Sequence, residues 1–188
     1  YLPCNDVFKD TEGNILISNM SLNIASTPVQ IHLVNLTDGS LTNVATLSGN
    51  GNISGRIDHV GVYGDVRSGN FTVFAAVAST ANVIRWKVSD GVVASAESKT
   101  FTKFYPATST TFGIAPRVFP ISATQFYADG HATAWTLYSF DNASTTIGSF
   151  AAVPDLAPSG TDDNGAATFK LGTSSYAVYS TDPYHQDT

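Results

Sequence analysis

Carboxylates are the most abundant ionisable groups in this sequence. Fifteen residues are Asp or Glu and nine are Lys or Arg, and Glu12 and Glu97 are the only glutamates. Two carboxyl groups about 5 to 10 Å apart are the arrangement that cleaves glycosidic bonds. Because the aspartates are spread along the chain, the sequence selects no pair, and glycoside cleavage stays an open alternative.

The densest acidic run is Asp162-Asp163-Asn164-Gly165. Carboxylate and carbonyl oxygens are the ligands that calcium prefers. Asp, Asn and Gly also favour turns for reasons of backbone geometry alone. We therefore expect a solvated hairpin turn and no cofactor, with calcium as the one alternative.

Residues of the common hydrolytic and zinc sites do not fall into their usual patterns. The four histidines, His32, His59, His131 and His185, occur singly and lack the i, i+4 spacing of zinc proteases. No Gly-x-Ser-x-Gly pentapeptide, the motif of a serine nucleophile elbow, occurs. The sequence predicts no metal site and names no catalytic residue, which favours a protein without catalytic activity.

Two tryptophans could stack on a sugar ring if their side chains were exposed. Trp86 follows Ile84 at the period of two that places strand residues on one face. We predict that Trp86 is buried in a core, and that Arg85 and Lys87 lie on the opposite, solvated face.

The stretch from Ala132 to Tyr138 alternates less cleanly between polar and apolar residues. This irregularity predicts that one ring of the two, Trp135 or Tyr138, lies at a blade edge, where it can stack on a ligand. They are the predicted ligand-binding residues.

The charge of the chain limits the class of partner. The formal net charge is −6 and the isoelectric point is near 4.9, with no basic cluster that could hold a phosphate backbone. We expect no nucleic-acid partner, and a neutral glycan in preference to a polyanionic one. No apolar run approaches the roughly 20 residues of a membrane-spanning helix. Cys4 is the only cysteine, so an internal disulfide is impossible.

The elements that must position these residues are short runs of β-branched and aromatic residues between Gly, Asn and Asp turns. None carries a helical period of any length, so an all-β fold is predicted. The expected strands cover residues 15–20, 29–36, 43–47, 60–62, 71–78, 83–88, 100–104, 125–127, 132–138, 166–171 and 176–179.

The turns recur along the chain. Gly13-Asn14, Gly69-Asn70 and Gly130-His131 each open a strand, at a spacing of roughly 60 residues. Asp38-Gly39 and Asp90-Gly91 predict tight hairpins, because Gly tolerates positive φ. Three to four repeats of about four strands, over residues 5–54, 55–115 and 116–188, are typical of β-propeller blades. A β-sandwich with irregular strand spacing is the alternative.

Four segments carry a resemblance to a known group of proteins. They are residues 5–39 (NDVFKDTEGNILISNMSLNIASTPVQIHLVNLTDG), residues 55–91, residues 113–130 (GIAPRVFPISATQFYADG) and residues 164–180 (NGAATFKLGTSSYAVYS). In this order they resemble secreted or surface β-propeller proteins of unassigned function from gut Bacteroidetes. The resemblance implies a secreted or outer-membrane-associated, extracytoplasmic location and transfers no catalytic motif. A closed propeller usually has more blades than this chain can form, so we expect an incomplete propeller and a fragment of a larger protein.

These observations lead to three hypotheses of function. The first is a non-catalytic binding or scaffold protein at a bacterial cell surface, associated with glycan or nutrient uptake. The second is an extracellular polysaccharide-active hydrolase or lyase. The third is a structural or adhesive module whose partner is a protein.

Overall fold

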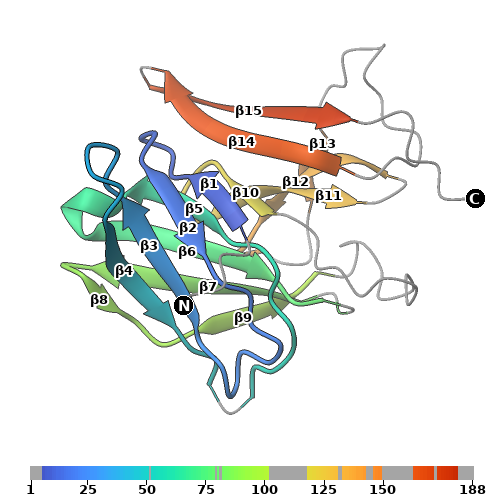
Figure 1. The fold of residues 1–188 in the computed structure, drawn as a ribbon. Helices are drawn as coiled ribbons and strands as arrows, with labels where there is room; N and C mark the ends of the chain where they lie inside the picture. The colour runs from blue at the N-terminus through green and yellow to red at the C-terminus, as the bar shows by residue number, and fades with distance from the viewer. Residues whose placement is uncertain are drawn as a thin grey trace, which may run out of the picture.

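The computed structural model describes residues 6–50, 52–78, 80, 82–101, 118–130, 133–142, 146–149, 163–171 and 173–181 (Figure 1). Their regular structure is β-strand throughout, apart from one 3-10 turn, η1 (Val66–Ser68). Every pairing between the named strands of these residues is antiparallel. The predicted all-β class is confirmed in these residues.

The first sheet is a meander of four strands that follow the chain in order. Its hairpin between the third and fourth strands contains Asp38-Gly39, as predicted, and Gly39 has a φ of +73°. Gly13, with a φ of +90°, forms the turn that precedes the second strand. The strands are β1 (Asp6–Lys9), β2 (Ile15–Ser18), β3 (Val29–Val34) and β4 (Leu41–Leu47).

The second sheet repeats this arrangement with a divided outer strand. Asp90 and Gly91 both have positive φ, 50° and 77°, so Asp90-Gly91 forms the tight hairpin that the sequence predicts. The last two strands of this sheet both pair with β7. The strands are β5 (Gly61–Asp65), β6 (Asn70–Ala76), β7 (Asn82–Ser89), β8 (Val92–Val93) and β9 (Glu97–Thr100).

A third sheet and a separate strand pair follow. The third sheet has the order β10-β11-β12-β13, and β14 and β15 form a two-stranded sheet. Their bounds are β10 (Val118–Pro120), β11 (Gln125–Gly130), β12 (Thr133–Ser139), β13 (Thr146–Ser149), β14 (Asp163–Leu171) and β15 (Ser174–Thr181). Asp163, Asn164 and Gly165 thus begin a strand and do not form the expected turn, while Asp162 lies outside the described residues.

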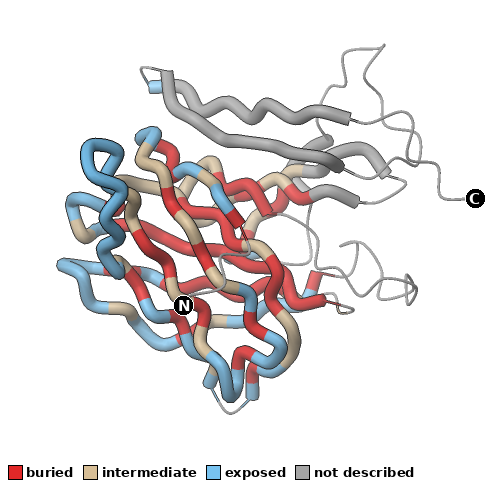
Figure 2. Tube along the Cα trace, in the orientation of Figure 1, coloured by how far each residue is buried: buried red, intermediate tan, exposed pale blue. Residues whose placement is uncertain are grey.

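The main core lies between the first and second sheets (Figure 2). Leu16, Ile31 and Leu47 enter it from the first sheet, and Val73 and Trp86 enter it from the second; all five are inaccessible to solvent. The Trp86 Nε1–H donates a hydrogen bond to the carbonyl oxygen of Ser48, 2.9 Å away, across the junction. The predicted burial of Trp86 is confirmed.

A second core covers the other face of the second sheet. Phe74 and Val83 point into it, and Phe126, Tyr138 and Phe140 meet them from the third sheet and the residue after β12. The two faces of β6 therefore face two different cores, which explains why every residue of β6 except Asn70 is buried. The second sheet is packed between the first and the third.

The first strands of successive sheets lie beside one another. Asp10, which follows β1, forms a parallel bridge with Val62 of β5, and β10 contacts both β5 and β14. The Asp10 carboxylate is fully buried and accepts hydrogen bonds from the backbone N–H groups of Asn14 and Val66, at 2.9 and 3.1 Å. This carboxylate joins the turn of the first sheet to the start of η1 in the second.

Candidate functional site

A polar group lies at the opposite end of β1 from Asp10, between the first two sheets. The Nδ1 atom of His59 is 3.1 Å from the Oδ2 atom of Asp6, the first residue of β1. The side chain of Asp6 is 7% exposed and that of His59 is 17% exposed. When Nδ1 donates to the carboxylate, the ring orientation is fixed and Nε2 remains as an acceptor.

Ser18 adds a hydroxyl group to this site. It is paired directly with Asp6 across β1 and β2, which places the two side chains on the same face of the sheet. Ser18 is buried, and its Oγ atom has no hydrogen-bond partner among the described residues. A buried hydroxyl group without a partner marks a place where water or a ligand atom can bind.

Arg56 and Asp58 form a second pair three residues before β5. The Nε–H of Arg56 donates to Oδ1 of Asp58 over 2.6 Å, and Asp58 is almost completely buried. The Arg56 side chain is 37% exposed, and its two terminal nitrogens have no partner among the described residues. The backbone of the intervening Ile57 is fixed by two hydrogen bonds with Ser21, at 2.8 and 2.9 Å.

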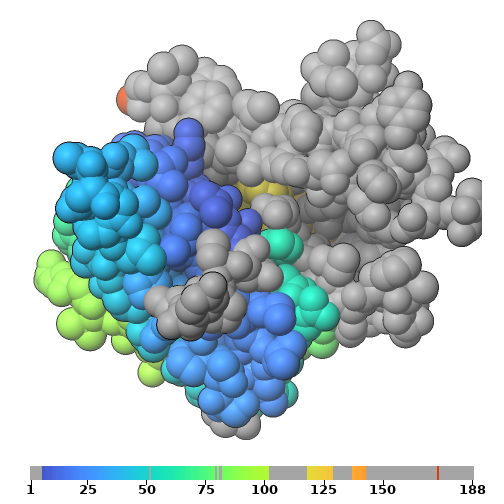
Figure 3. Space-filling model, in the orientation of Figure 1, coloured from blue at the N-terminus to red at the C-terminus, as the bar shows by residue number. Residues whose placement is uncertain are grey.

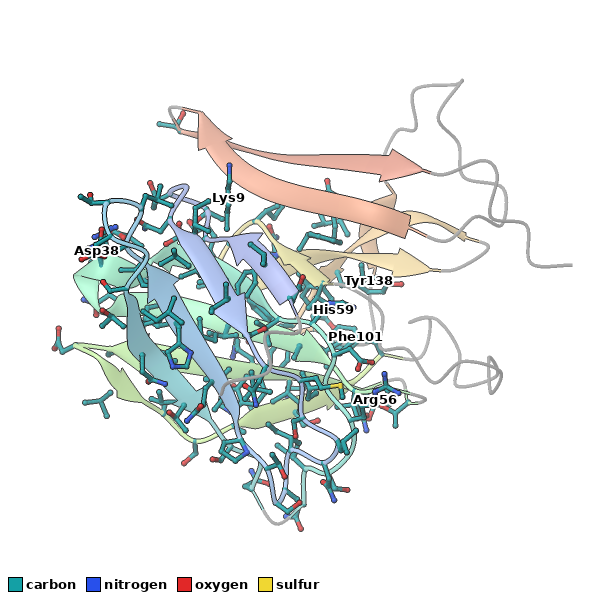
Figure 4. The ribbon with its side chains drawn as sticks, viewed as in Figure 1. Lys9, Asp38, Arg56, His59, Phe101 and Tyr138 are labelled. Carbon is teal, nitrogen blue, oxygen red and sulfur yellow. The ribbon has the colours of Figure 1, made fainter. Side chains whose placement is uncertain are left out.

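The candidate residues therefore form two separate pairs. Arg56 pairs with Asp58 and His59 pairs with Asp6, and the pairs are linked through residues 56–59 of the segment before β5; Figure 4 labels Arg56 and His59. The acidic and basic groups nearly balance, so the site holds both donors and acceptors without a large local charge. Such a set can bind a neutral polar molecule. It also contains an oriented histidine, the usual general base.

The predicted ligand-binding residues lie on a different element. Trp135 and Tyr138 both belong to β12, and the side chain of Trp135 lies outside the described ones. Tyr138 is 4% exposed, and its ring packs against Phe101 and Phe126, with both centroid separations at 5.6 Å. Tyr138 is therefore not a ring at a blade edge, because aromatic side chains of the second core cover it. Its role in binding stays a prediction that this burial does not favour.

The environment of Arg85 differs from the one predicted. It was expected on a solvated strand face, but it is only 3% exposed, because the third sheet covers that face of β7. Its guanidinium group pairs with Glu97 at 2.7 Å and Asp141 at 3.0 Å, and lies 4.3 Å from the ring centre of Phe140. Lys87 on the same strand face is exposed, as expected.

The environment of Glu97 shifts its ionisation. Burial raises the pKa of Glu97, but the hydrogen bond and positive charge of Arg85 outweigh this effect, with a smaller contribution from Lys87. The net result is a pKa below the ordinary value of 4.5. The ion pair thus remains formed at neutral pH.

Comparison with known proteins gives a likeness in fold. No family model matches the chain, and no curated protein matches it. A solved structure of a DUF4623 family protein from Bacteroides eggerthii is similar, with a TM-score of 0.58 and 12% sequence identity. The match covers 89% of this chain and 36% of that one, so this chain spans about a third of the length of its structural relative.

At this identity the likeness concerns the fold alone. The relative comes from a Bacteroides species, which agrees with the resemblance to gut Bacteroidetes proteins found in the sequence. Its description names no ligand and no reaction, so the candidate site must be interpreted from its own geometry.

Sequence reasoning missed the pairing of Asp6 with His59, which are 53 residues apart. Nothing in local spacing joins them. The one available signal is their position, because each lies where a new sheet begins. Asp6 is at the start of β1 and His59 is just before β5. These two residues come together when the first strands of the two sheets lie side by side.

In the described residues, no group of three or more His, Cys, Asp or Glu side chains is arranged to hold a metal ion. No helix in this part of the chain combines the length and hydrophobicity needed to cross a bilayer.

Proposed function

We propose that this chain is part of a β-propeller-type protein that binds a neutral polar ligand, a glycan, at a bacterial cell surface without catalysing its breakdown. Support for the propeller comes from the successive antiparallel sheets, which stack face to face with β1, β5 and β10 side by side. The surface location and the link to glycan or nutrient uptake rest on the resemblance in sequence.

The binding proposal rests on two basic side chains, Arg56 and His59, which are held in place by a carboxylate and still have free hydrogen-bonding atoms in the described residues. Asp58 orients Arg56 and Asp6 orients His59, and each basic side chain keeps hydrogen-bonding atoms that no described residue uses. Sugar hydroxyl groups donate and accept hydrogen bonds, so they match a site that offers both. An acidic polymer would be repelled by the net charge of −6 on this chain.

A binding screen tests this proposal. Neutral and acidic oligosaccharides would be presented on an array, and hits measured by isothermal titration with wild type, Arg56→Gln and His59→Gln. We expect about tenfold weaker binding of a neutral oligosaccharide by each variant, measured at a temperature at which circular dichroism shows the variant to be folded. Trp135→Ala tests the predicted stacking residue in the same way. Tight binding of a sulfated or uronic polymer would contradict the charge argument.

A second function, hydrolase or lyase, is favoured by one observation, the carboxylate-oriented His59. Its Nε2 atom could accept a proton from a bound sugar or a water molecule. Incubation of the protein with mixed polysaccharides distinguishes the binding function from the catalytic one. Binding without turnover supports the binding function. Turnover that is abolished by His59→Gln supports the hydrolase or lyase. Neither binding nor turnover would favour the structural or adhesive module.

A further inference from the structure

Two exposed apolar side chains lie on the short segment between β2 and β3. Met20 is 38% exposed and Leu22 is 69% exposed, whereas Ser21 between them is completely buried. Single apolar residues on a surface are ordinary, so exposure by itself assigns them no role. The feature that sets this pair apart is the charged group beside it.

The segment is paired with the residues that carry Arg56. Ser21 and Ile57 form an antiparallel bridge, and each donates its backbone N–H to the carbonyl oxygen of the other, at 2.9 and 2.8 Å. Residues on either side of such a pair point to the opposite face of the bridge. Leu22 is therefore opposite Arg56, at a Cβ separation of about 5 Å, on the face turned away from the buried Ser21 and Ile57.

Met20 is opposite Asp58 in the same arrangement. Asp58 is buried and holds the Nε–H of Arg56 at 2.6 Å, while the terminal nitrogens of Arg56 bind no described residue. The exposed face therefore has an apolar part, Met20 and Leu22, and a part that donates hydrogen bonds. Because Asp58 balances the charge of Arg56, these donors act with little net charge.

The segment that presents Leu22 has a fixed backbone. The carbonyl oxygen of Asn23 accepts from the N–H groups of Ser26 and Thr27 at 3.0 and 2.8 Å, and its side-chain oxygen accepts from the N–H of Gly55 at 3.2 Å. Figure 3 shows this blue segment at the lower surface of the molecule. Little conformational entropy is lost when such a surface contacts a ligand.

A sugar ring carries the two kinds of group that this surface fits. The faces of a pyranose ring bear C–H groups and its edges bear hydroxyl groups. When all hydroxyl groups are equatorial, as in glucose, both faces are apolar. One face can then cover Leu22 and Met20 while hydroxyl oxygens at the edge accept hydrogen bonds from Arg56.

We propose that Met20 and Leu22 form the apolar part of the ligand site at Arg56, and that the ligand is a neutral hexopyranose with equatorial hydroxyl groups. This inference rests on the proposed glycan binding and names the class of sugar. Sugar hydroxyl groups exchange hydrogen bonds with water for hydrogen bonds with protein, so they add little affinity by themselves. Removal of the apolar surface of Leu22 from water adds the larger part.

Isothermal titration with cellotetraose and maltotetraose, two neutral glucose oligomers, tests the proposal. The variant is Leu22→Ser, and Leu36→Ser is the matched control, because Leu36 is 78% exposed beyond the opposite end of β3. We expect wild type to bind at least one tetramer, Leu22→Ser to bind it about tenfold more weakly, and Leu36→Ser to bind it as wild type does. Met20→Gln is a second variant of the same surface and should also bind more weakly. Circular dichroism at the titration temperature establishes that each variant is folded.

Equal affinity of wild type, Leu22→Ser and Met20→Gln for a tetramer whose binding Arg56→Gln weakens would overturn this inference and leave the proposed glycan binding intact. Wild type that binds neither glucose tetramer, but binds another neutral glycan through Arg56, would have the same consequence. If no neutral oligosaccharide binds at all, the proposed function fails and this inference fails with it.

Discussion

Trp86 is the residue on which the junction between the first two sheets most depends. It fills the core with its ring and uses its one polar atom to reach Ser48 on the opposite side. Truncation removes a large buried volume and leaves a cavity that the surrounding strands cannot close. We expect Trp86→Ala to lower the free energy of unfolding by about 3 to 5 kcal/mol in urea denaturation.

Val92→Ala serves as the comparison for that measurement, because Val92 is 69% exposed. Its cost should stay below about 0.5 kcal/mol. A similar small loss for Trp86→Ala would mean that the ring is not part of the core.

The burial of a residue was predictable where the period of two along a strand determines which face of the sheet its side chain is on. The period of two placed Ile84 and Trp86 together, and they share the main core. The same period placed Arg85 on the opposite face correctly, but it carries no information about what covers that face. A third sheet that begins 33 residues later in the chain covers it (85 to 118), and local periodicity does not extend that far. Local periodicity likewise did not indicate that Phe101 and Phe126 cover the ring of Tyr138.

At the scale of the elements, the carboxylate of Asp10 holds together the turn before β2 and the turn before β6. Its Oδ1 atom also accepts from the backbone N–H of Glu12 at 3.0 Å. Its Oδ2 atom accepts from the side-chain Nδ2–H of Asn14 at 2.7 Å. Removal of the carboxylate leaves the buried N–H of Val66 without a partner. We expect Asp10→Ala to cost roughly 2 to 4 kcal/mol of unfolding free energy, measured in urea.

Asp10→Asn gives the informative control, since the amide oxygen can still accept some of these hydrogen bonds. It should lose less stability than Asp10→Ala. Equal losses would indicate that the charge, and not the number of accepted hydrogen bonds, stabilises the turn.

The junction of β7 and β9 with the third sheet should respond to acid through Glu97. Its pKa is lower in the folded protein than the ordinary value, so ionised Glu97 stabilises the fold above pH 4.5, and this contribution is lost as pH falls through the folded-state pKa. The difference in unfolding midpoint between wild type and Glu97→Gln should therefore be largest near neutral pH and shrink below about pH 4.5. A difference that stays constant to pH 3 would exclude this ion pair as its source.

The turns were the most predictable elements. Asp38-Gly39 and Asp90-Gly91 form hairpins because glycine accepts the positive φ that each turn requires. The paired candidate residues Asp6 and His59 were not predictable, since their contact depends on the parallel placement of β1 and β5. Repeated turn and strand patterns predict successive sheets, but they do not indicate which strand of one sheet lies beside which strand of the next.

At the scale of the whole molecule, the second sheet links two cores. Phe74 belongs to the aromatic core on one face of β6, and Val73 belongs to the main core on the other. The rings of Phe126 and Phe140 lie 5.4 and 5.8 Å from that of Phe74. Because one strand serves both cores, loss of either should weaken the packing of the same sheet.

We therefore expect the first and second cores to unfold together. Phe74→Ala should cost about 3 to 5 kcal/mol, as Trp86→Ala does, and each variant should show one transition. The test compares tryptophan fluorescence with far-ultraviolet circular dichroism in the same urea series, in a Trp135→Phe background. Trp86 is then the one tryptophan and reports on the main core, while ellipticity reports on all the sheets. If Phe74→Ala separates the two curves while wild type keeps them coincident, the sheets fold as independent units and the shared β6 strand does not couple them.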